Sequence, residues 1–424
     1  MWGEYTKQSR FATIPEMWFI SYILRKNFQM TKIIPAIAFF CFCIGFCQQS
    51  TLAFVDKNSI DLASGNYLSV LSDEVKSKTV VALGEASHGT HEFSAEKSKI
   101  IRHLIAKSNF RTIGFEFGYS AIEEINQYVL TGKGDLKELM VPLKLFDTQE
   151  FFDLFESIGK FNVGKSPKDK VDLYGFDTDF YKSDNDASAK FCLDYLLKNP
   201  DKFKNGKASA KAFENVTKVD YVAFLSDEDK SAIAKLQLEL SLLKLSDAES
   251  RKFKKSVSLL FQGTLLSDPL ARDEFMAKNA LDFQSDTKNK MIVWGHNVHL
   301  AKDTTMAQCR GMGFYLREKL SDKYYAVGFD TFRGKVTILG ENDFEHKDFE
   351  AKPDSFSAEL SKAKSPSFLL LLDDTKNPIY GKDSKITNIF ANFGRNLSLT
   401  MRPGIDFDAL IFIRETTPTI TIKR

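Results

Sequence analysis

Short runs of β-branched and other apolar residues recur along the chain, and each run has the length of a buried strand. They cover residues 79–84, 111–117, 170–176, 290–295, 325–329, 367–373 and 409–414. After the first two runs, residues 92–107 and 121–130 carry apolar side chains at helical spacing. Strands that alternate with helices predict an α/β fold, with a mostly parallel β-sheet flanked by helices on both faces.

The long interval between the third and fourth runs contains no convincing strand. Its apolar positions recur with a helical period, and good helix formers such as Ala, Leu, Lys and Glu are frequent. The expected helices are 188–197, 229–245, 249–266 and 269–283. We therefore expect residues 198–267 to form a helical insertion, or cap, within a core built from residues 48–197 and 268–424.

The N-terminal region contains an apolar run without charge at residues 33–47. At 15 residues this run is shorter than the ~20 that span a bilayer, but it has the length of a signal-peptide core. Small residues three and one positions before Gln48 fit a cleavage site there. We expect Met30 to be the true start and residues 1–47 to be absent from the mature protein. The protein would then be exported, to the periplasm or outside the cell, without a stable membrane span; anchoring through this segment is the alternative.

The charge of the chain is nearly balanced, with 58 Lys and Arg against 56 Asp and Glu, a net of +2. So slight a basic excess argues against a nucleic-acid partner. Residues 1–47 hold five of the basic and two of the acidic residues, so the remainder carries a net charge of −1. Outside that segment the cysteines are Cys192 and Cys309, which form no Cys-x-x-Cys or Cys/His cluster for zinc. Whether they pair is left open.

Acidic side chains and histidines follow four of the expected strands at the point where each strand ends. They are Glu85, His88, Glu116, Asp177, His296 and His299. In an open parallel sheet, ligands bind outside the carboxyl ends of the strands, so we expect these side chains to share one rim. Asp177 has an equal alternative as a helix N-cap, and His91 is interpreted as a structural or surface residue.

Four segments resemble, in order and spacing, motifs of the erythromycin esterase family. Residues 84–92 (GEASHGTHE) are similar to its G-E-x-x-H-G-x-x-E segment, and Glu116 to the glutamate of its second strand. Residues 271–279 (ARDEFMAKN) resemble its R-D-x-x-M-A-x-N helix, and residues 294–299 (WGHNVH) its H-N-x-H strand end. The resemblance covers residues 79–414 and implies an α/β core with a helical insertion. It also implies ester hydrolysis without a metal or another cofactor.

Some members of this family cleave the lactone of macrolide antibiotics. Those members have an Arg nine residues after the motif histidine, where this chain has Lys97. Lys keeps the positive charge but not the planar, forked donor geometry of Arg. Ester hydrolysis is therefore expected, whereas macrolide specificity, the substrate itself and the oligomeric state are left open.

A hypothesis for the chemistry makes His88 the general base that activates a water, since its ordinary pKa of ~6.5 suits that task. Glu85 or Glu116 would orient its ring and stabilise the imidazolium, as a carboxylate does in a catalytic triad. Arg272 and His296 would polarise the substrate carbonyl. Further substrate contacts are expected from His299, Asn297, Asp177 and Lys97.

Other mechanisms stay open at this point. No Gly-x-Ser-x-Gly nucleophile elbow occurs in residues 48–424, so direct attack by water is preferred, with Ser87 as the alternative nucleophile. A metal-dependent hydrolase would use His88, His296 and His299 with nearby carboxylates. A non-catalytic protein would instead bind a ligand at the same rim. We prefer a metal-independent hydrolase without a cofactor, acting on a small-molecule ester.

Overall fold

The computed structural model describes residues 51–178, 182–267, 270–341, 343–394 and 397–424. The expected signal segment at residues 33–47 lies outside these ranges, so its cleavage and the export of the protein stay predictions. In the part of the chain that is described, no helix combines the length and the apolar character needed to cross a bilayer.

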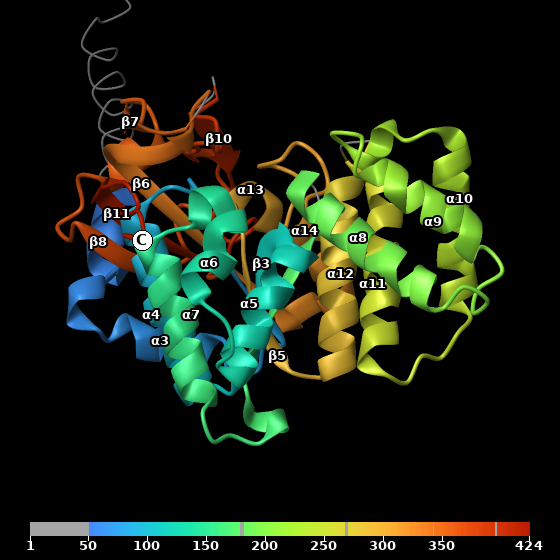
Figure 1. Cartoon of the computed structure of the whole chain (residues 1–424). Coiled ribbons are helices and arrows are strands. Elements are labelled where there is room, and N and C mark those ends of the chain that lie inside the picture. The colour runs from blue at the N-terminus through green and yellow to red at the C-terminus, as the bar shows by residue number, and fades with distance from the viewer. Residues whose placement is uncertain (1–50, 179–181, 268–269, 342, 395–396) are drawn as a thin grey trace, which may run out of the picture. The chain divides into compact units, whose positions relative to one another are not determined.

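A mixed, mostly parallel sheet forms the centre of the fold (Figure 1). Within the described residues it has nine strands, in the order β1-β8-β11-β6-β2-β5-β3-β4, with β7 paired to β6. The strands from β11 to β4 run parallel, whereas β1, β7 and β8 pair antiparallel with their neighbours. This confirms the predicted α/β fold class. The bounds are β1 (Ile60–Asp61), β2 (Val80–Leu83), β3 (Phe110–Gly118), β4 (Asp172–Asp177), β5 (Lys290–Trp294), β6 (Tyr324–Leu339), β7 (Phe344–Glu350), β8 (Ser367–Leu371) and β11 (Ala409–Thr416), with a separate antiparallel pair β9 (Ser384–Thr387) and β10 (Ser398–Met401).

Helices cover both faces of the sheet, and the central strands are therefore buried on both sides. In β2, Val81 and Leu83 join one apolar cluster, whereas Val80 and Ala82 join the other. The first cluster includes residues of α3 (Tyr67–Glu74), α4 (His91–Lys107), α5 (Tyr119–Thr131), α6 (Leu136–Met140), η3 (Val141–Phe146) and α7 (Gln149–Asn162). The second includes residues of α12 (Ala271–Thr287), α13 (Asn297–Leu300), α14 (Met312–Leu320) and α15 (Phe356–Leu360). The short turns are η2 (Leu62–Ser64), η4 (Pro167–Asp169) and η6 (Ser321–Lys323).

Between β4 and β5 the chain forms a helical cluster with an apolar core of its own, drawn in green and yellow in Figure 1. Cys192 and Tyr195 of the first helix pack in the same core as Phe213 and Phe253 of later ones. The domain boundaries at residues 198 and 267 stay predictions. The helix α8, which ends at Lys198, also shares this apolar core. The cluster consists of α8 (Lys182–Lys198), α9 (Gly206–Val216), η5 (Val222–Phe224), α10 (Asp227–Ser241) and α11 (Ala248–Thr264).

The carboxyl ends of β2, β5, β3 and β4 meet at one edge, because these strands are parallel neighbours. Leu83 of β2 and Phe115 of β3 both pair with Trp294 of β5. The residues one or two positions beyond this row are Glu85, Glu116 and His296.

Candidate active site

The loop between β2 and α4 carries the buried carboxylate of Glu85, which has partners on both of its oxygens. Its Oε1 lies 2.7 Å from Nδ1 of His88. Its Oε2 accepts hydrogen bonds from Nζ of Lys97 at 2.6 Å and from the indole N–H of Trp294 at 2.9 Å. Lys97 is fully buried, and its Nζ lies 4.4 Å from the centre of the Trp294 ring in a cation–π contact. These contacts fix Glu85 and, through it, the ring of His88.

Burial and charge pairing act in opposite directions on the Glu85–Lys97 pair. Burial raises the pKa of Glu85, but Lys97 and His88 lower it by more, so the net shift is downward. Burial lowers the pKa of Lys97 to about 8, although Glu85 raises it. Both side chains therefore carry their charges at neutral pH.

Glu116, near the end of β3, joins three other parts of the site. Its Oε2 accepts a hydrogen bond from the backbone N–H of His296 at 2.8 Å. Its Oε1 accepts one from Nη2 of Arg272 at 3.1 Å and lies 3.3 Å from Nε2 of His299. Burial raises the pKa of Glu116, but His299 and Arg272 outweigh it and hold that pKa well below its usual range. Glu116 is therefore an ionised carboxylate at the centre of the site.

Arg272, in the first turn of α12, is held between two carboxylates. Its Nε donates to Oδ1 of Asp177 at 3.1 Å and its Nη2 donates to Oδ2 at 2.6 Å, a forked geometry. Burial lowers the pKa of Arg272, but Asp177 and Glu116 raise it by more. For Asp177, burial raises the pKa although Arg272 lowers it. The side chain of Asp177 is thus bound to Arg272, which joins the end of β4 to the rest of the site.

His296 follows β5 and caps the short helix α13. Its Nδ1 accepts a hydrogen bond from the backbone N–H of Val298 at 3.4 Å. Its Nε2 is buried and has no hydrogen-bond partner among the described residues. Burial, and then the neighbouring His88, lower the pKa of His296 to about 3. The neutral ring that accepts at Nδ1 carries its proton on Nε2, so an uncommitted N–H donor lies beside His88.

Two phenylalanines flank the histidine pair. The ring centres of His88 and His296 are 5.0 Å apart. Phe146 in η3 meets the ring of His88 edge-on at 5.2 Å, and Phe390 stacks on His296 at 5.7 Å. The sequence predicts neither contact, because the chain has 38 Phe residues and no spacing distinguishes these two.

His299, in α13, lies between two carboxylates. Its Nδ1 is 2.8 Å from Oδ1 of Asp273, and its Nε2 is 3.3 Å from Oε1 of Glu116. Burial lowers the pKa of His299, but Glu116 and Asp273 raise it above its ordinary value. Asp273 was not among the predicted site residues. Its place beside Arg272 in the segment 271–279 was the available signal.

Two of the predicted substrate-binding residues lie behind the site. Asn297 is buried; its Nδ2 donates to the carbonyl of Phe329 at 2.7 Å, and its Oδ1 accepts from the N–H of Phe329 at 3.2 Å. The amide of Asn297 thus ties the start of α13 to β6. Lys97 is equally buried, against Glu85. For both residues a substrate contact stays a prediction, and their geometry fits a role in holding the site together.

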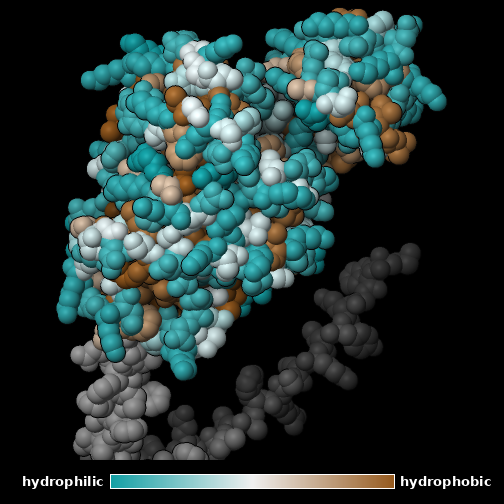
Figure 2. Space-filling model, turned by 90° about the horizontal axis from the view of Figure 1, so that it is seen from below, coloured by the Kyte–Doolittle hydropathy of each residue, from teal (hydrophilic) through white to brown (hydrophobic). Residues whose placement is uncertain are grey.

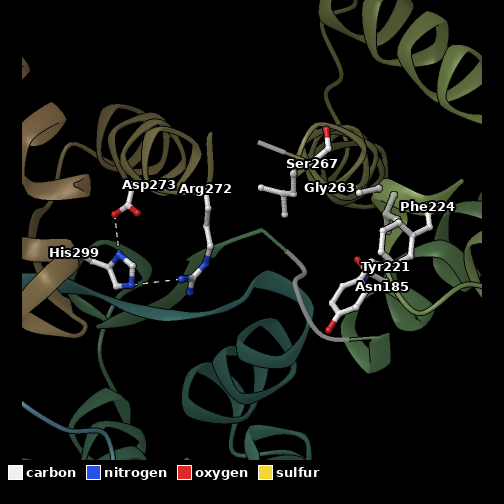
Figure 3. A pocket seen from close by; sticks show the side chains of 11 residues that line it. Asn185, Tyr221, Phe224, Gly263, Ser267, Arg272, Asp273 and His299 are labelled. Atoms are coloured by element: carbon white, nitrogen blue, oxygen red, sulfur yellow. Dashed lines mark hydrogen bonds and ion pairs between the residues drawn. The ribbon is translucent and has the colours of Figure 1, made fainter. Parts of the chain in front are cut away.

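A cavity of about 550 Å³ lies between the helical cluster and the start of α12 (Figure 3). One side is polar and consists of Arg272, Asp273 and His299. The opposite side comes from the helical cluster and includes Tyr221, Val222, Phe224 and Leu266. Figure 2 also shows hydrophobic side chains at the outer surface of the lobe that the helical cluster forms. The cavity has the volume of a small-molecule pocket, and one of its walls carries a few polar groups.

Within the described ranges, no group of three or more His, Cys, Asp or Glu is placed to hold a metal ion. Cys192 is buried in the helical cluster, and it forms no disulfide with Cys309.

The model of a protein family described as Erythromycin esterase matches residues 105–416 of the chain. The loop with Glu85 and His88 precedes the match. The matched residues include the other side chains at the strand ends, which are Glu116, Asp177, His296 and His299, and also Arg272 and Asp273 of α12.

Individual proteins show the same likeness. "Putative hydrolase YbfO" of Bacillus subtilis (strain 168) is 25% identical over 408 residues, which cover 85% of this chain and 89% of that protein. Erythromycin esterase type II of Escherichia coli is 25% identical over 309 residues, which cover 61% of this chain and 70% of that protein. The solved structure of a mutant of the erythromycin esterase EreC, in its open conformation, superposes with a TM-score of 0.63 at 19% identity and covers 83% of this chain and 94% of that one. At this identity the structural likeness concerns the fold.

Proposed function

The chain belongs to the erythromycin esterase family, and from this premise we propose that it is a hydrolase that cleaves an ester or lactone with a water activated by His88. The observation that carries the proposal is the 2.7 Å contact between Nδ1 of His88 and the buried carboxylate of Glu85. An ionised carboxylate can only accept a hydrogen bond, so Nδ1 holds the proton. Nε2 of His88 is then free to take a proton from water.

Glu85 supports this base in the transition state. When Nε2 takes the proton, His88 becomes a cation, and the adjacent carboxylate stabilises it and keeps the ring oriented. Lys97 offsets the charge of Glu85 while the base is neutral, which keeps the buried carboxylate ionised. We assign the orienting role to Glu85 rather than to Glu116, because the oxygens of Glu116 bind Arg272 and the backbone of His296.

His296 is the proposed donor to the oxyanion that forms when water attacks the carbonyl. Its ring is neutral at physiological pH, because its pKa is lowered to about 3 by burial and by His88. Its Nε2–H has no partner among the described residues, so donation to the oxyanion breaks no existing bond. Arg272 adds positive charge on the cavity side, where it also holds Asp177 and Glu116 in place.

We place an apolar body of the substrate in the cavity, whose polar residues Arg272 and His299 contact Glu116 at the centre of the site. Val222, Phe224 and Leu266 would contact that body, while His299 and Arg272 on the opposite wall would contact polar substituents. The Escherichia coli relative is named for one ester, erythromycin. For this chain we propose a small-molecule ester or lactone, and whether it is a macrolide depends on the Lys97 difference described above.

A hydrolysis screen tests the proposal. The protein that begins at Gln48 is incubated with a panel of esters and lactones, and products are identified by mass spectrometry. His88→Ala should lower kcat by about 10²–10⁴-fold, the usual contribution of a positioned base, with an unchanged circular dichroism spectrum. His346→Ala is the matched control, because His346 is exposed on β7. Undiminished hydrolysis by His88→Ala would overturn the proposal, and ligand-induced thermal stabilisation without turnover would favour a non-catalytic binding protein.

Export completes the proposal. We propose that residues 33–47 direct the chain out of the cytoplasm and that cleavage before Gln48 releases the hydrolase into the periplasm or the medium. Sequencing of the N-terminus of protein recovered from those fractions tests this, and an N-terminus upstream of residue 33 on the recovered protein would contradict it.

A further inference from the structure

Residues 417–424, called here the strap, follow β11 and cross the loop that carries His88. The backbone N–H of Thr417 donates to Oε2 of Glu92 at 2.7 Å, and its Oγ1 donates to Oε1 at the same distance. The carbonyl of Thr417 accepts from the N–H of His91 at 2.9 Å, and the N–H of Thr419 donates to the carbonyl of Gly89 at 3.2 Å. The strap therefore holds the second half of the loop, immediately after His88.

Further along, the strap meets the start of α7 at a buried carboxylate, Glu150. Oε1 of Glu150 accepts from the N–H of Ile420 at 3.0 Å and lies 2.6 Å from Nδ1 of His91. The N–H of Gln149 donates to the carbonyl of Ile420 at 2.8 Å. A single carboxylate oxygen thus joins the strap, the first residue of α4 and the start of α7.

The far end of the strap reaches the segment on the other side of His88. Arg424 donates from Nη2 to Oδ2 of Asp147 at 2.5 Å and to the carbonyl of Lys137 at 3.0 Å. Nζ of Lys137 donates to the carbonyl of Lys423 at 2.6 Å, and Figure 1 shows this end of the chain beside α6. Asp147 is next to Phe146, whose ring flanks His88 at 5.2 Å.

The first half of the loop is held independently of the strap. The N–H of Asn297 donates to the carbonyl of Glu85 at 2.9 Å, and the N–H of Ile389 donates to the carbonyl of Ala86 at 2.7 Å. The N–H of Thr337 on β6 also donates to the carbonyl of Gly89 at 3.0 Å, so loss of the strap would loosen the part of the loop after His88 without detaching it from β6, while the Glu85 backbone stays in place.

We propose that the strap is a positioning device for the proposed base. It holds the loop between β2 and α4 (residues 84–90), which carries His88, in place against Phe146 of η3, and Glu150 is the central residue of this arrangement. The inference rests on the proposed function for its catalytic consequence. Glu150 acts through His91 and the strap backbone, not through substrate. The strap also lies beyond residues 105–416, the part of the chain that matches the family model.

Two variants test the strap. Glu150→Gln, made in the full chain, keeps the size of the side chain but removes its charge. The second variant is a shortened chain that ends at Thr416 and lacks the strap. Both should lower kcat by roughly 10- to 100-fold with little change in KM, since misplacement of a catalytic group has costs of this order. Hydrogen–deuterium exchange of peptides from residues 84–92 should become faster in both. Glu156→Gln is the matched control, because Glu156 lies on the same helix and is 41% exposed.

The two readouts separate this inference from the proposed function. Unchanged exchange in residues 84–92 in both variants would overturn the strap, with or without a known substrate. Faster exchange with an unchanged kcat would overturn its positioning role. If His88→Ala retains full activity, the proposed role of His88 as the base is wrong. Faster exchange of residues 84–92 in the two strap variants would still show that the strap holds the loop in place. If exchange increases throughout the shortened chain, the Glu150→Gln variant is the test. Unchanged exchange of residues 84–92 in Glu150→Gln would then overturn the inference.

Discussion

Lys97 and Glu85 form a buried ion pair directly behind His88. Both side chains are at most 1% exposed, and Nζ of Lys97 has a second favourable contact in the ring of Trp294. Charges removed from water are tolerated only when they are paired, so the loss of one partner leaves the other as an uncompensated buried charge. Such a loss costs far more than the loss of a surface ion pair.

Replacement of this lysine should therefore destabilise the whole fold. We expect Lys97→Met to lower the free energy of unfolding by about 3–5 kcal/mol, because Glu85 would stay buried without its cation. Lys99→Met is the matched control on the same helix: Lys99 is 57% exposed, and its pair with Glu96 should contribute no more than about 1 kcal/mol. Urea unfolding measures both variants, and equal losses would contradict the assigned role of the buried pair.

The residues of the site differ in how far the sequence could predict them. The acidic and histidine side chains expected at the strand ends are linked by contacts at one edge of the sheet, because parallel neighbours place their carboxyl ends together. Phe146 and Phe390 reach the same place from a turn and a loop. Their positions depend on tertiary packing, which no local pattern in one sequence contains.

At the scale of elements, β6 is longer than its sequence pattern predicts. The expected strand covers residues 325–329, whereas β6 continues to Leu339 and pairs antiparallel with β7. In the extension, exposed Arg333 and Lys335 precede buried Val336, so it lacks the continuous apolar run by which a fully buried strand is recognised. The start of the strand could be predicted because both of its faces are covered.

The extension of β6 explains why a glycine follows His88. A Cβ on Gly89 would lie 1.9 Å from the carbonyl oxygen of Thr337. Gly89→Ala should therefore push the loop off the strand and lower the free energy of unfolding by about 1–3 kcal/mol. Gly159→Ala is the control, because a Cβ in that α7 position meets its nearest atoms at 3.8 Å and should stabilise the helix by up to about 1 kcal/mol. A chemical denaturation series that shows both variants equally stable would contradict this account.

For the whole molecule, the alternation of strands and helices was sufficient to predict the α/β class. Successive residues of β2 alternate between the two apolar clusters that flank the sheet, and this is the packing that such alternation implies. The direction of each strand was harder to predict from the sequence. The antiparallel neighbours β1, β7 and β8 carry no local sign of their orientation, because hydrogen-bond direction is decided by the connections and not by side-chain pattern.

A buried carboxyl on β6 makes the stability of the whole fold depend on pH. Asp330 is fully buried and accepts hydrogen bonds from Oγ of Ser357 at 2.8 Å and from the N–H of Thr387 at 3.0 Å. Burial raises the pKa of Asp330 to about 7, although Ser357 and Thr387 lower it. Between the unfolded value of about 4 and this folded value, the folded protein binds a proton that the unfolded chain does not. This group therefore contributes stability that is lost as the pH rises toward 7.

Asp330→Asn should remove that dependence, because an amide binds no proton in this range. At about pH 5 the folded native Asp330 is protonated but the unfolded chain is already ionised there, so the variant should be more stable than the native protein by about 1.5 kcal/mol. At about pH 8 the native carboxylate is ionised, and the variant should gain up to about 4 kcal/mol relative to the native protein. Asp348→Asn, which alters an 81% exposed carboxylate on the paired strand β7, should show no such change. Urea unfolding at both pH values measures the difference, and an equal effect of Asp330→Asn at the two would show that Asp330 does not titrate between them.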